Sequence, residues 1–290
     1  MRNISARYSG SDEAWFRETL SQFYLPFAYL TLVKRPGQHY LRRGVIQEDL
    51  AFWLIASLPL ASHIGWHILG VILLVVSFWC VYEQGYVDND RMGALHETDP
   101  KLSSAFFENK VATPIITPWI WAAVLGIMGL SALNGGTLPA PSTIAAWAAT
   151  LVATALSFCL FNRVEKKHRI FVYPILQVFR AAAIAAVAPI SPVAVGGVLG
   201  VVTSAWIAYV VYRQRPENKW PDMKLGAIRA IATALFSVPL LVALGFTTMN
   251  LLVAGIFIAW NIFRGRNDIV DAWRSVRFID STMKRPGHRS

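Results

Sequence analysis

Charged residues are scarce in this chain of 290 residues, since Asp, Glu, Lys and Arg together make up only 15% of it. Apolar residues make up 55%, including 11 Trp, and the mean hydropathy is +0.44. A soluble domain cannot bury this much apolar surface in one core. The composition therefore excludes an ordinary soluble protein and indicates an integral membrane protein.

Cysteine is rarer still, with only Cys80 and Cys159 in the whole chain. Both lie inside apolar runs, so we expect them to be small buried side chains, not a disulfide or a metal-binding pair. The first 20 residues are charged and contain no apolar run followed by a cleavage site. We therefore expect no removable signal peptide.

Apolar runs of roughly 20 residues, the length that crosses a bilayer as a helix, predict the fold class. A shorter apolar segment at 23–33 is interrupted by Pro26, and we interpret it as an interfacial or re-entrant piece, with a ninth span as the alternative. The sequence thus predicts an all-α, polytopic transmembrane helical bundle of about eight to nine spans. The eight predicted spans lie near 48–65, 66–85, 114–134, 142–162, 170–189, 191–212, 226–245 and 246–264.

Charge is absent from alternate loops of this arrangement. Of the 27 basic residues, 26 lie on one face of the bundle, together with all 17 acidic residues. Because Lys and Arg in short loops stay in the cytoplasm, we expect this face and both termini to be cytoplasmic, as in a multi-pass protein of a bacterial inner membrane. Topology then accounts for the net charge of +10, and nucleic acid is not expected as a partner.

No repeat of fixed period divides the chain, so we predict one transmembrane domain with two flanking segments. Residues 1–47 form a cytoplasmic or interfacial segment, residues 48–265 the transmembrane domain, and residues 266–290 a cytoplasmic amphipathic tail. In the tail, Ile269, Trp273 and Val276 recur at helical spacing beside Arg274, which is typical of a helix lying on lipid headgroups.

Acidic and amide residues crowd the stretch 82–100, YEQGYVDNDRMGALHETDP, directly after an apolar run. If the helix continues through it, Glu83, Tyr86 and Asp90 share one stripe. Neighbouring carboxylates repel unless they are protonated or bridged by a cation, and such oxygen ligands suit Mg²⁺ shared with a substrate phosphate. The alternative is a solvated helix end.

Two basic loops lie on the same face as this stretch. Lys and Arg there can neutralise a phosphate, although topology alone also explains them. Glu217 and Asp222 in the second loop could complete another metal site. The basic residues that we assign to phosphate contacts in these loops are Arg163, Lys166, Lys167, Arg213 and Arg215.

Arg180 is the one basic residue that does not lie on the charged face, and it stands about 15 Å along its predicted helix. A charge at that depth is costly unless it faces a cavity or an ionic partner. We expect no acidic partner from within the spans, and this favours a role toward substrate over a structural ion pair.

These residues together resemble the UbiA prenyltransferase superfamily over about residues 45–265. The first motif of that family, N-D-x-x-D-x-x-x-D, is similar to Asn89, Asp90, Gly93 and Glu97, with Gly93 standing where the family has an aspartate. Glu217 and Asp222 follow the sixth helix, although their spacing differs from D-x-x-x-D. The stretch 157–189, with Arg180, resembles the branch of polyprenyl-phosphate phosphoribosyltransferases.

The resemblance implies a UbiA-like bundle that transfers a prenyl group from an isoprenoid diphosphate to a second small-molecule substrate within membrane lipid. It implies Mg²⁺ as cofactor, with Asn89, Asp90, Glu97, Glu217 and Asp222 as ligands. Asp90, Glu97 and Arg180 are the expected catalytic residues. Substrate contacts are expected from Glu83, Tyr86, Arg163, Lys166, Lys167, Arg213 and Arg215.

Three alternatives stay open at this point. The nearest is phosphoribosyl transfer from phosphoribosyl diphosphate to polyprenyl phosphate, and a prenyl-diphosphate cyclase is another. The third is a non-catalytic lipid-binding protein or transporter, which Gly93 and the irregular second motif favour. The sequence does not indicate whether the protein is a monomer or an oligomer.

Overall fold

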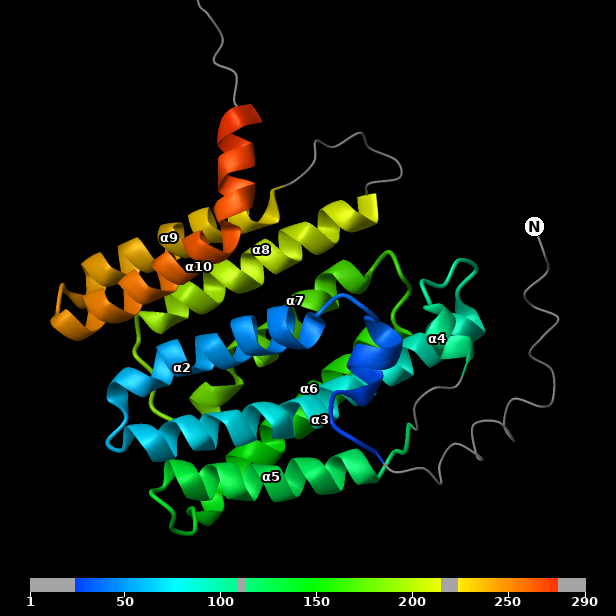
Figure 1. The fold of residues 1–290 in the computed structure, drawn as a ribbon, viewed down its shortest axis with the longest axis horizontal. Helices are drawn as coiled ribbons and strands as arrows, with labels where there is room; N and C mark the ends of the chain where they lie inside the picture. The colour runs from blue at the N-terminus through cyan, green and yellow to red at the C-terminus, as the bar shows by residue number, and fades with distance from the viewer. Residues whose placement is uncertain (1–23, 109–112, 215–223, 276–290) are drawn as a thin grey trace, which may run out of the picture.

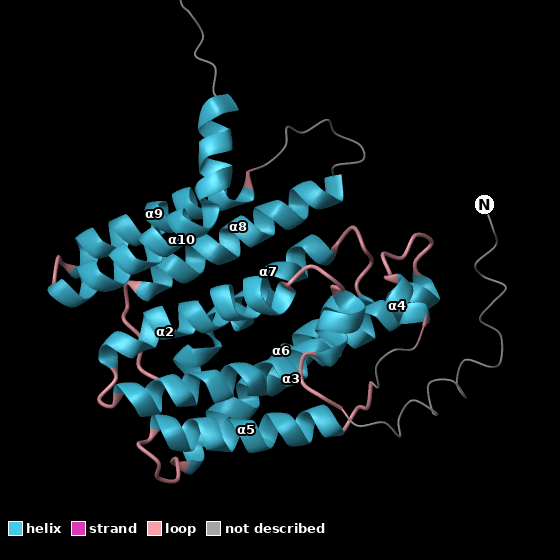
Figure 2. Cartoon of the chain, viewed as in Figure 1, coloured by secondary structure: helices cyan, strands magenta, loops and turns pink. Residues whose placement is uncertain are grey.

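Every regular element in the described part of the chain is a helix (Figure 2). A computed structural model describes residues 24–108, 113–214 and 224–275. The all-α prediction is confirmed for these residues. In chain order the elements are η3 (Leu30–Lys34), η4 (Leu41–Leu50), α2 (Ala51–Ser57), η5 (Leu58–Leu60), α3 (Ile64–His96), α4 (Ser104–Phe107), α5 (Thr117–Leu133), α6 (Pro141–Arg163), α7 (Arg169–Ala182), η6 (Ala183–Ala186), α8 (Ala194–Gln214), α9 (Leu225–Leu244) and α10 (Thr248–Ser275).

Six of the described helices are long and apolar enough to cross a membrane: α3, α6, α7 with η6, α8, α9 and α10. Two of the predicted spans coincide with shorter helical segments. α5 is apolar but has 17 residues, and the first predicted span falls on η4, α2 and η5, which together cover residues 41–60. The structure thus shows a helical bundle of the kind that spans a membrane.

Apolar side chains cover the outside of this bundle as well as its core. Leu156, Leu235 and Val242 are more than 60% exposed on α6 and α9. Such surfaces are costly in water, but they suit a lipid environment, in which the helix satisfies its own backbone hydrogen bonds. The outward apolar faces therefore agree with an integral membrane protein.

The helices form two groups with a middle layer between them (Figure 1). α3 packs against α5 and α6, and α9 packs between α8 and α10. α7 contacts both α6 and α8, while α2 contacts α3 and α10. The middle layer of α2 and α7 therefore connects the two groups.

α3 is the longest helix and carries the acidic stretch. Its 33 residues measure about 50 Å at 1.5 Å per residue, which exceeds the roughly 30 Å of a hydrocarbon core. The helix runs on to His96, well past the predicted end of the span at residue 85. The prediction that this helix continues through Glu83, Tyr86 and Asp90 is confirmed.

The two flanking segments differ from their predicted boundaries. The described part of 1–47 packs against the bundle, since Tyr24, Tyr29 and Leu30 are buried and η3 contacts α3 and α4. α10 continues past residue 265 to Ser275, so the described part of the tail is one helix with the last span. Trp273 is exposed there, and Val276 lies outside the described residues.

The two cysteines are both free. Cys80 is buried, as expected from its apolar surroundings. Cys159 is exposed, so the expectation of burial is wrong for this residue. The apolar run around Cys159 does not show from sequence which residues of α6 face the bundle and which face outward.

A close approach of α3 and α5 depends on two glycines. A Cβ on Gly70 would lie 2.8 Å from the carbonyl oxygen of Gly129, and a Cβ on Gly129 would lie 3.0 Å from that of Gly70. We predict that Gly70→Ala lowers the free energy of unfolding in detergent by about 1–3 kcal/mol, because backbone atoms must separate.

Gly255→Ala is the matched control, since a Cβ there meets nothing within 4 Å. This change is expected to leave stability equal or raise it by up to about 1 kcal/mol, because alanine is the better helix former. Equal melting temperatures for the Gly70 variant and the wild type would contradict the tight crossing.

Candidate functional site

A cavity of about 500 Å³ opens beside the end of α3 that carries the acidic stretch. Its walls come from α3, α6, α7, α8 and the turn after η3. Seven cationic side chains line it against two carboxylates, Asp90 and Glu97, which leaves an excess of five positive charges. The cationic residues are Lys34, Arg35, Lys101, Lys166, Arg169, Arg180 and Arg213.

Both oxygens of the Asp90 carboxylate have partners from the N-terminal segment. The Tyr29 hydroxyl donates to Oδ2 at 2.8 Å, and the Lys34 ammonium forms an ion pair with Oδ1. Asp90 is only 4% exposed. The same ammonium lies 5.5 Å from the ring centroid of Tyr86. Asp90 thus holds a lysine that comes from 56 residues earlier in the chain.

Glu97, which ends α3, is held in the same way by the loop between α6 and α7. Arg169 donates to its Oε1 at 2.7 Å, and Lys166 lies 2.9 Å from its Oε2. Partial burial disfavours the charged form of Glu97, yet the hydrogen bonds and charges of Lys166 and Arg169 outweigh burial and lower its pKa. The carboxylate therefore stays ionised and orients both cations.

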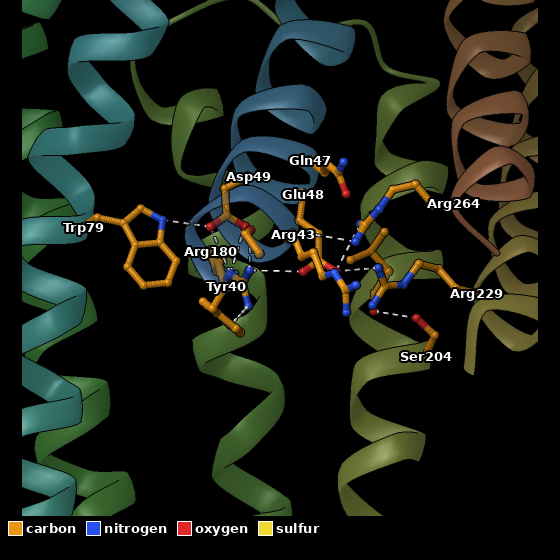
Figure 3. Close-up of polar contacts among 12 residues, drawn as sticks. Tyr40, Arg43, Gln47, Glu48, Asp49, Trp79, Arg180, Ser204, Arg229 and Arg264 are labelled. Atoms are coloured by element: carbon orange, nitrogen blue, oxygen red, sulfur yellow. Dashed lines mark hydrogen bonds and ion pairs between the residues drawn. The ribbon is translucent and has the colours of Figure 1, made fainter. Parts of the chain in front are cut away.

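Arg180 on α7 is buried among groups of the protein (Figure 3). Its Nε donates to Asp49 at 2.8 Å, and one terminal nitrogen donates to the Gly44 carbonyl and to Glu48 at 2.7 and 3.0 Å. The other terminal nitrogen donates to the Tyr40 hydroxyl at 3.2 Å. These bonds use four of the five N–H groups of the guanidinium.

The expectation that the spans offer Arg180 no acidic partner is wrong. Glu48 and Asp49 stand at the very start of the first predicted span, and the helical run over 41–60 brings both of them to α7. Asp49 also accepts a hydrogen bond from the Trp79 indole at 2.8 Å. Arg180 therefore has the structural ion pair that the sequence had disfavoured, and it also lines the cavity.

Glu48 gathers three arginines from three helices (Figure 3). Arg229 on α9 and Arg264 on α10 donate to its Oε1 at 2.7 and 3.0 Å, and Arg180 on α7 donates to its Oε2. The four side chains are each at most 20% exposed. One carboxylate thus joins η4 to α7 of the middle layer and to α9 and α10.

Aromatic rings form the apolar part of the cavity wall. Tyr173 on α7 stacks on Tyr209 of α8 with centroids 4.2 Å apart, and Phe161 lies about 6 Å from both. Arg213 donates to the Tyr209 hydroxyl at 2.9 Å and its guanidinium lies over that ring. Tyr82 on α3 also meets Phe158 on α6, with ring centroids 4.6 Å apart. The cavity therefore offers both cations and aromatic faces.

The structure brings together many of the residues that the sequence predicts. Because α3 is continuous, its residues Tyr86, Asn89 and Asp90 face one cavity with Glu97 at its end, while the α6–α7 loop, α7 and α8 approach from the other side. The predicted residues that line the cavity are Tyr86, Asn89, Asp90, Glu97, Lys166, Arg180 and Arg213.

Glu83 has a different place from the one predicted. It is fully buried and accepts hydrogen bonds from the Tyr24 hydroxyl and the backbone amides of Leu30 and Phe27, at 2.6, 2.7 and 3.1 Å. It does not line the cavity. Glu83 instead fixes the N-terminal segment on α3, which carries Lys34 into position.

Two basic residues also fall elsewhere. Arg163 lines a neighbouring cavity and bonds to Cys159, and Lys167 pairs with Glu165 at 3.1 Å on the surface. Arg215, Glu217 and Asp222 lie outside the described residues.

Sequence reasoning missed the contribution of the N-terminal segment. Lys34, Arg35 and Tyr40 line the cavity but were assigned to the flanking segment, where basic residues were explained by topology. The available signal was the run KRPGQHYLRR, which directly precedes the first apolar run. Its Lys and Arg residues are as closely spaced as those of the two basic loops that directly follow apolar runs. Arg169, Lys101 and Gln177 also line the cavity.

The arrangement of carboxylates decides whether the described residues fit Mg²⁺. This ion needs about six oxygen ligands and usually takes one or two carboxylates together with substrate phosphates. Among the described residues no three His, Cys, Asp or Glu side chains form a group able to hold a metal. Both carboxylates of the cavity are already engaged by cations. So arranged, these residues do not fit a protein-held Mg²⁺, and the ion stays a prediction of the resemblance.

Comparison of the chain with protein-family models, with curated proteins and with solved structures finds no match. The resemblance to the UbiA superfamily therefore stays a prediction that rests on the residues quoted above.

Removing the charge of Glu48 tests the three-arginine cluster. We predict that Glu48→Gln lowers the free energy of unfolding by about 3–5 kcal/mol, because three poorly exposed arginines lose a shared anion. Glu165→Gln is the control, since Glu165 is 61% exposed beside Lys167 and its removal should cost at most about 1 kcal/mol. Denaturation of both variants in the same detergent measures the difference, and equal losses would contradict a structural role for Glu48.

The lowered pKa of Glu97 predicts a pH dependence. Its ion pairs stabilise the fold fully above the ordinary glutamate pKa of about 4.3, and this stabilisation is lost as the pH falls through the lower pKa of the folded state. The melting temperatures of the wild type and Glu97→Gln should differ most near neutral pH and converge in acid. A difference that stays constant down to pH about 3 would argue against ionised Glu97 as the partner.

Proposed function

We propose that this protein is an intramembrane transferase of the UbiA type that acts on an isoprenoid diphosphate. The observation that carries the proposal is the cavity itself, which joins an excess of five positive charges to stacked aromatic walls inside a membrane-type bundle. An isoprenoid diphosphate has two parts that match this cavity, an anionic head for the cations and an apolar chain for the aromatic rings. Cations bind the head by charge-assisted hydrogen bonds, and apolar rings receive the chain.

The proposal includes the finer topology. With α5 and the run over 41–60 counted as spans, the bundle has eight. From the gathering of basic residues at one end of the helices, we infer that the cavity and both termini face the cytoplasm of a bacterial inner membrane. Membrane lipid would surround the outward apolar faces.

The reaction needs an anionic leaving group to be stabilised. The bond between C1 of the prenyl chain and the bridging oxygen breaks, and diphosphate leaves with the electron pair. The nucleophilic atom of the acceptor bonds to C1 and releases its proton. In this scheme Lys34, Arg35 and Arg213 take up the charge of the leaving diphosphate, and Asp90 and Glu97 hold the cations beside them.

Phosphoribosyl transfer to polyprenyl phosphate is the second candidate. It is favoured by the number of hydroxyl and amide groups in the cavity, which could bond to ribose hydroxyls. These groups belong to Tyr40, Tyr82, Tyr86, Asn89, Tyr173, Gln177, Tyr209 and Tyr212.

A ligand panel distinguishes the candidates. The protein in detergent is melted with farnesyl diphosphate, polyprenyl phosphate or phosphoribosyl diphosphate, and the ligand that stabilises it is tested for transfer. Arg213→Gln should weaken binding of the true substrate roughly 10- to 100-fold, because a charged hydrogen-bond donor is lost. Lys167→Gln should leave binding unchanged, because Lys167 is exposed, pairs with Glu165 and does not line the cavity. No stabilisation by any ligand would favour the non-catalytic lipid-binding protein or transporter.

A further inference from the structure

The cavity is rich in cations that no carboxylate neutralises. Among the described residues, Arg35 contacts the Tyr40 ring, while Arg213 contacts only tyrosines, and neither forms an ion pair with an acidic side chain. Lys34 has one carboxylate partner, although an ammonium can donate three hydrogen bonds. All three residues line the same cavity. Binding capacity for an anion is therefore present before any metal ion is added.

The described acidic residues of the cavity already accept bonds from protein donors, which leaves no carboxylate oxygen without a partner for a divalent cation. Each oxygen of Asp90 and of Glu97 already accepts a bond from a protein donor. Gly93, one turn after Asn89 on α3, brings no further carboxylate to the cavity that it lines. A divalent cation at Asp90 would have to displace the Lys34 ammonium and would add charge to a site that is already positive.

We propose that this cavity binds a diphosphate group without a divalent metal ion, with Lys34, Arg35 and Arg213 as the neutralising groups. The inference deepens the proposed function and rests on it for the apolar part of the ligand. Basic side chains can replace a metal here because forked arginine contacts neutralise phosphate oxygens directly. A diphosphate head carries two to three negative charges, which Arg35, Arg213 and the remaining donors of Lys34 can meet.

The first experiment measures binding of inorganic diphosphate to the full chain in detergent by titration calorimetry, once in EDTA and once in Mg²⁺. We expect binding in EDTA, and an apparent dissociation constant in Mg²⁺ that is equal or higher, because Mg²⁺ also chelates free diphosphate. Binding that disappears in EDTA and returns with Mg²⁺ would overturn the inference.

Substitution of Asp90 distinguishes a metal-free site from a metal site. Asp90→Asn removes one negative charge but keeps an oxygen for Tyr29, so metal-free binding of diphosphate should become tighter, whereas a metal site would lose it. Arg213→Gln should weaken binding roughly 10- to 100-fold in EDTA. Melting curves without ligand show whether each variant is folded. Weaker diphosphate binding by a folded Asp90→Asn protein would overturn the inference.

Gly93→Asp provides a gain-of-function control. A Cβ at Gly93 would meet only Pro100 and Glu97, at 3.8 and 3.9 Å, which is ordinary van der Waals contact. The added carboxylate should weaken diphosphate binding in EDTA and make binding respond to Mg²⁺. A variant that binds diphosphate in EDTA as tightly as the wild type would count against the electrostatic account.

The results separate this inference from the proposed function. Metal-free binding of inorganic diphosphate, without stabilisation by farnesyl diphosphate, would support the anion site and reject the isoprenoid substrate. Stabilisation by farnesyl diphosphate only in Mg²⁺ would support the substrate and reject the metal-free site.

Discussion

The acidic pair of partly exposed Glu48 and buried Asp49 is the constraint on which the bundle depends. Through Arg180, Arg229 and Arg264 it ties η4 to α7, α9 and α10, and through Trp79 it reaches α3. Removing such charges from solvent is unfavourable, and only close, well-satisfied partners offset that cost. Helices from both groups must therefore meet at one point, and that point adjoins the cavity through Arg180 and Tyr40.

The N-terminal segment turns an acidic helix end into a positive cavity. Glu83 accepts hydrogen bonds from two backbone amides and a tyrosine hydroxyl of this segment, and these bonds hold the segment against α3. The turn that follows η3 then supplies Lys34 and Arg35. Glu83, which the sequence predicts as a substrate contact, therefore lies behind the cavity wall and fixes the segment that carries Lys34 and Arg35.

Helix positions were predictable from the sequence because lipid imposes a simple length and composition on each span. The continuation of α3 through Asp90 also followed from helical spacing. The pairing of Arg180 did not, because its partners Glu48 and Asp49 are more than 130 residues away and stand at the end of a predicted span. Lys34 was missed for a different reason, since basic residues before a span have the same pattern whether they orient the protein or line a cavity.

Three acidic residues in this structure share one arrangement, in which a carboxylate fixes a cation from a distant segment. Asp90 holds Lys34, Glu97 holds Arg169 across 72 residues, and Asp49 holds Arg180 across 131 residues. Each cation lines the cavity, so the carboxylates determine where along its wall the positive charges lie. The acidic stretch that resembles a metal-binding motif thus orients positively charged side chains. These cations, and not the carboxylates, are the charged groups that the cavity can offer to an anion.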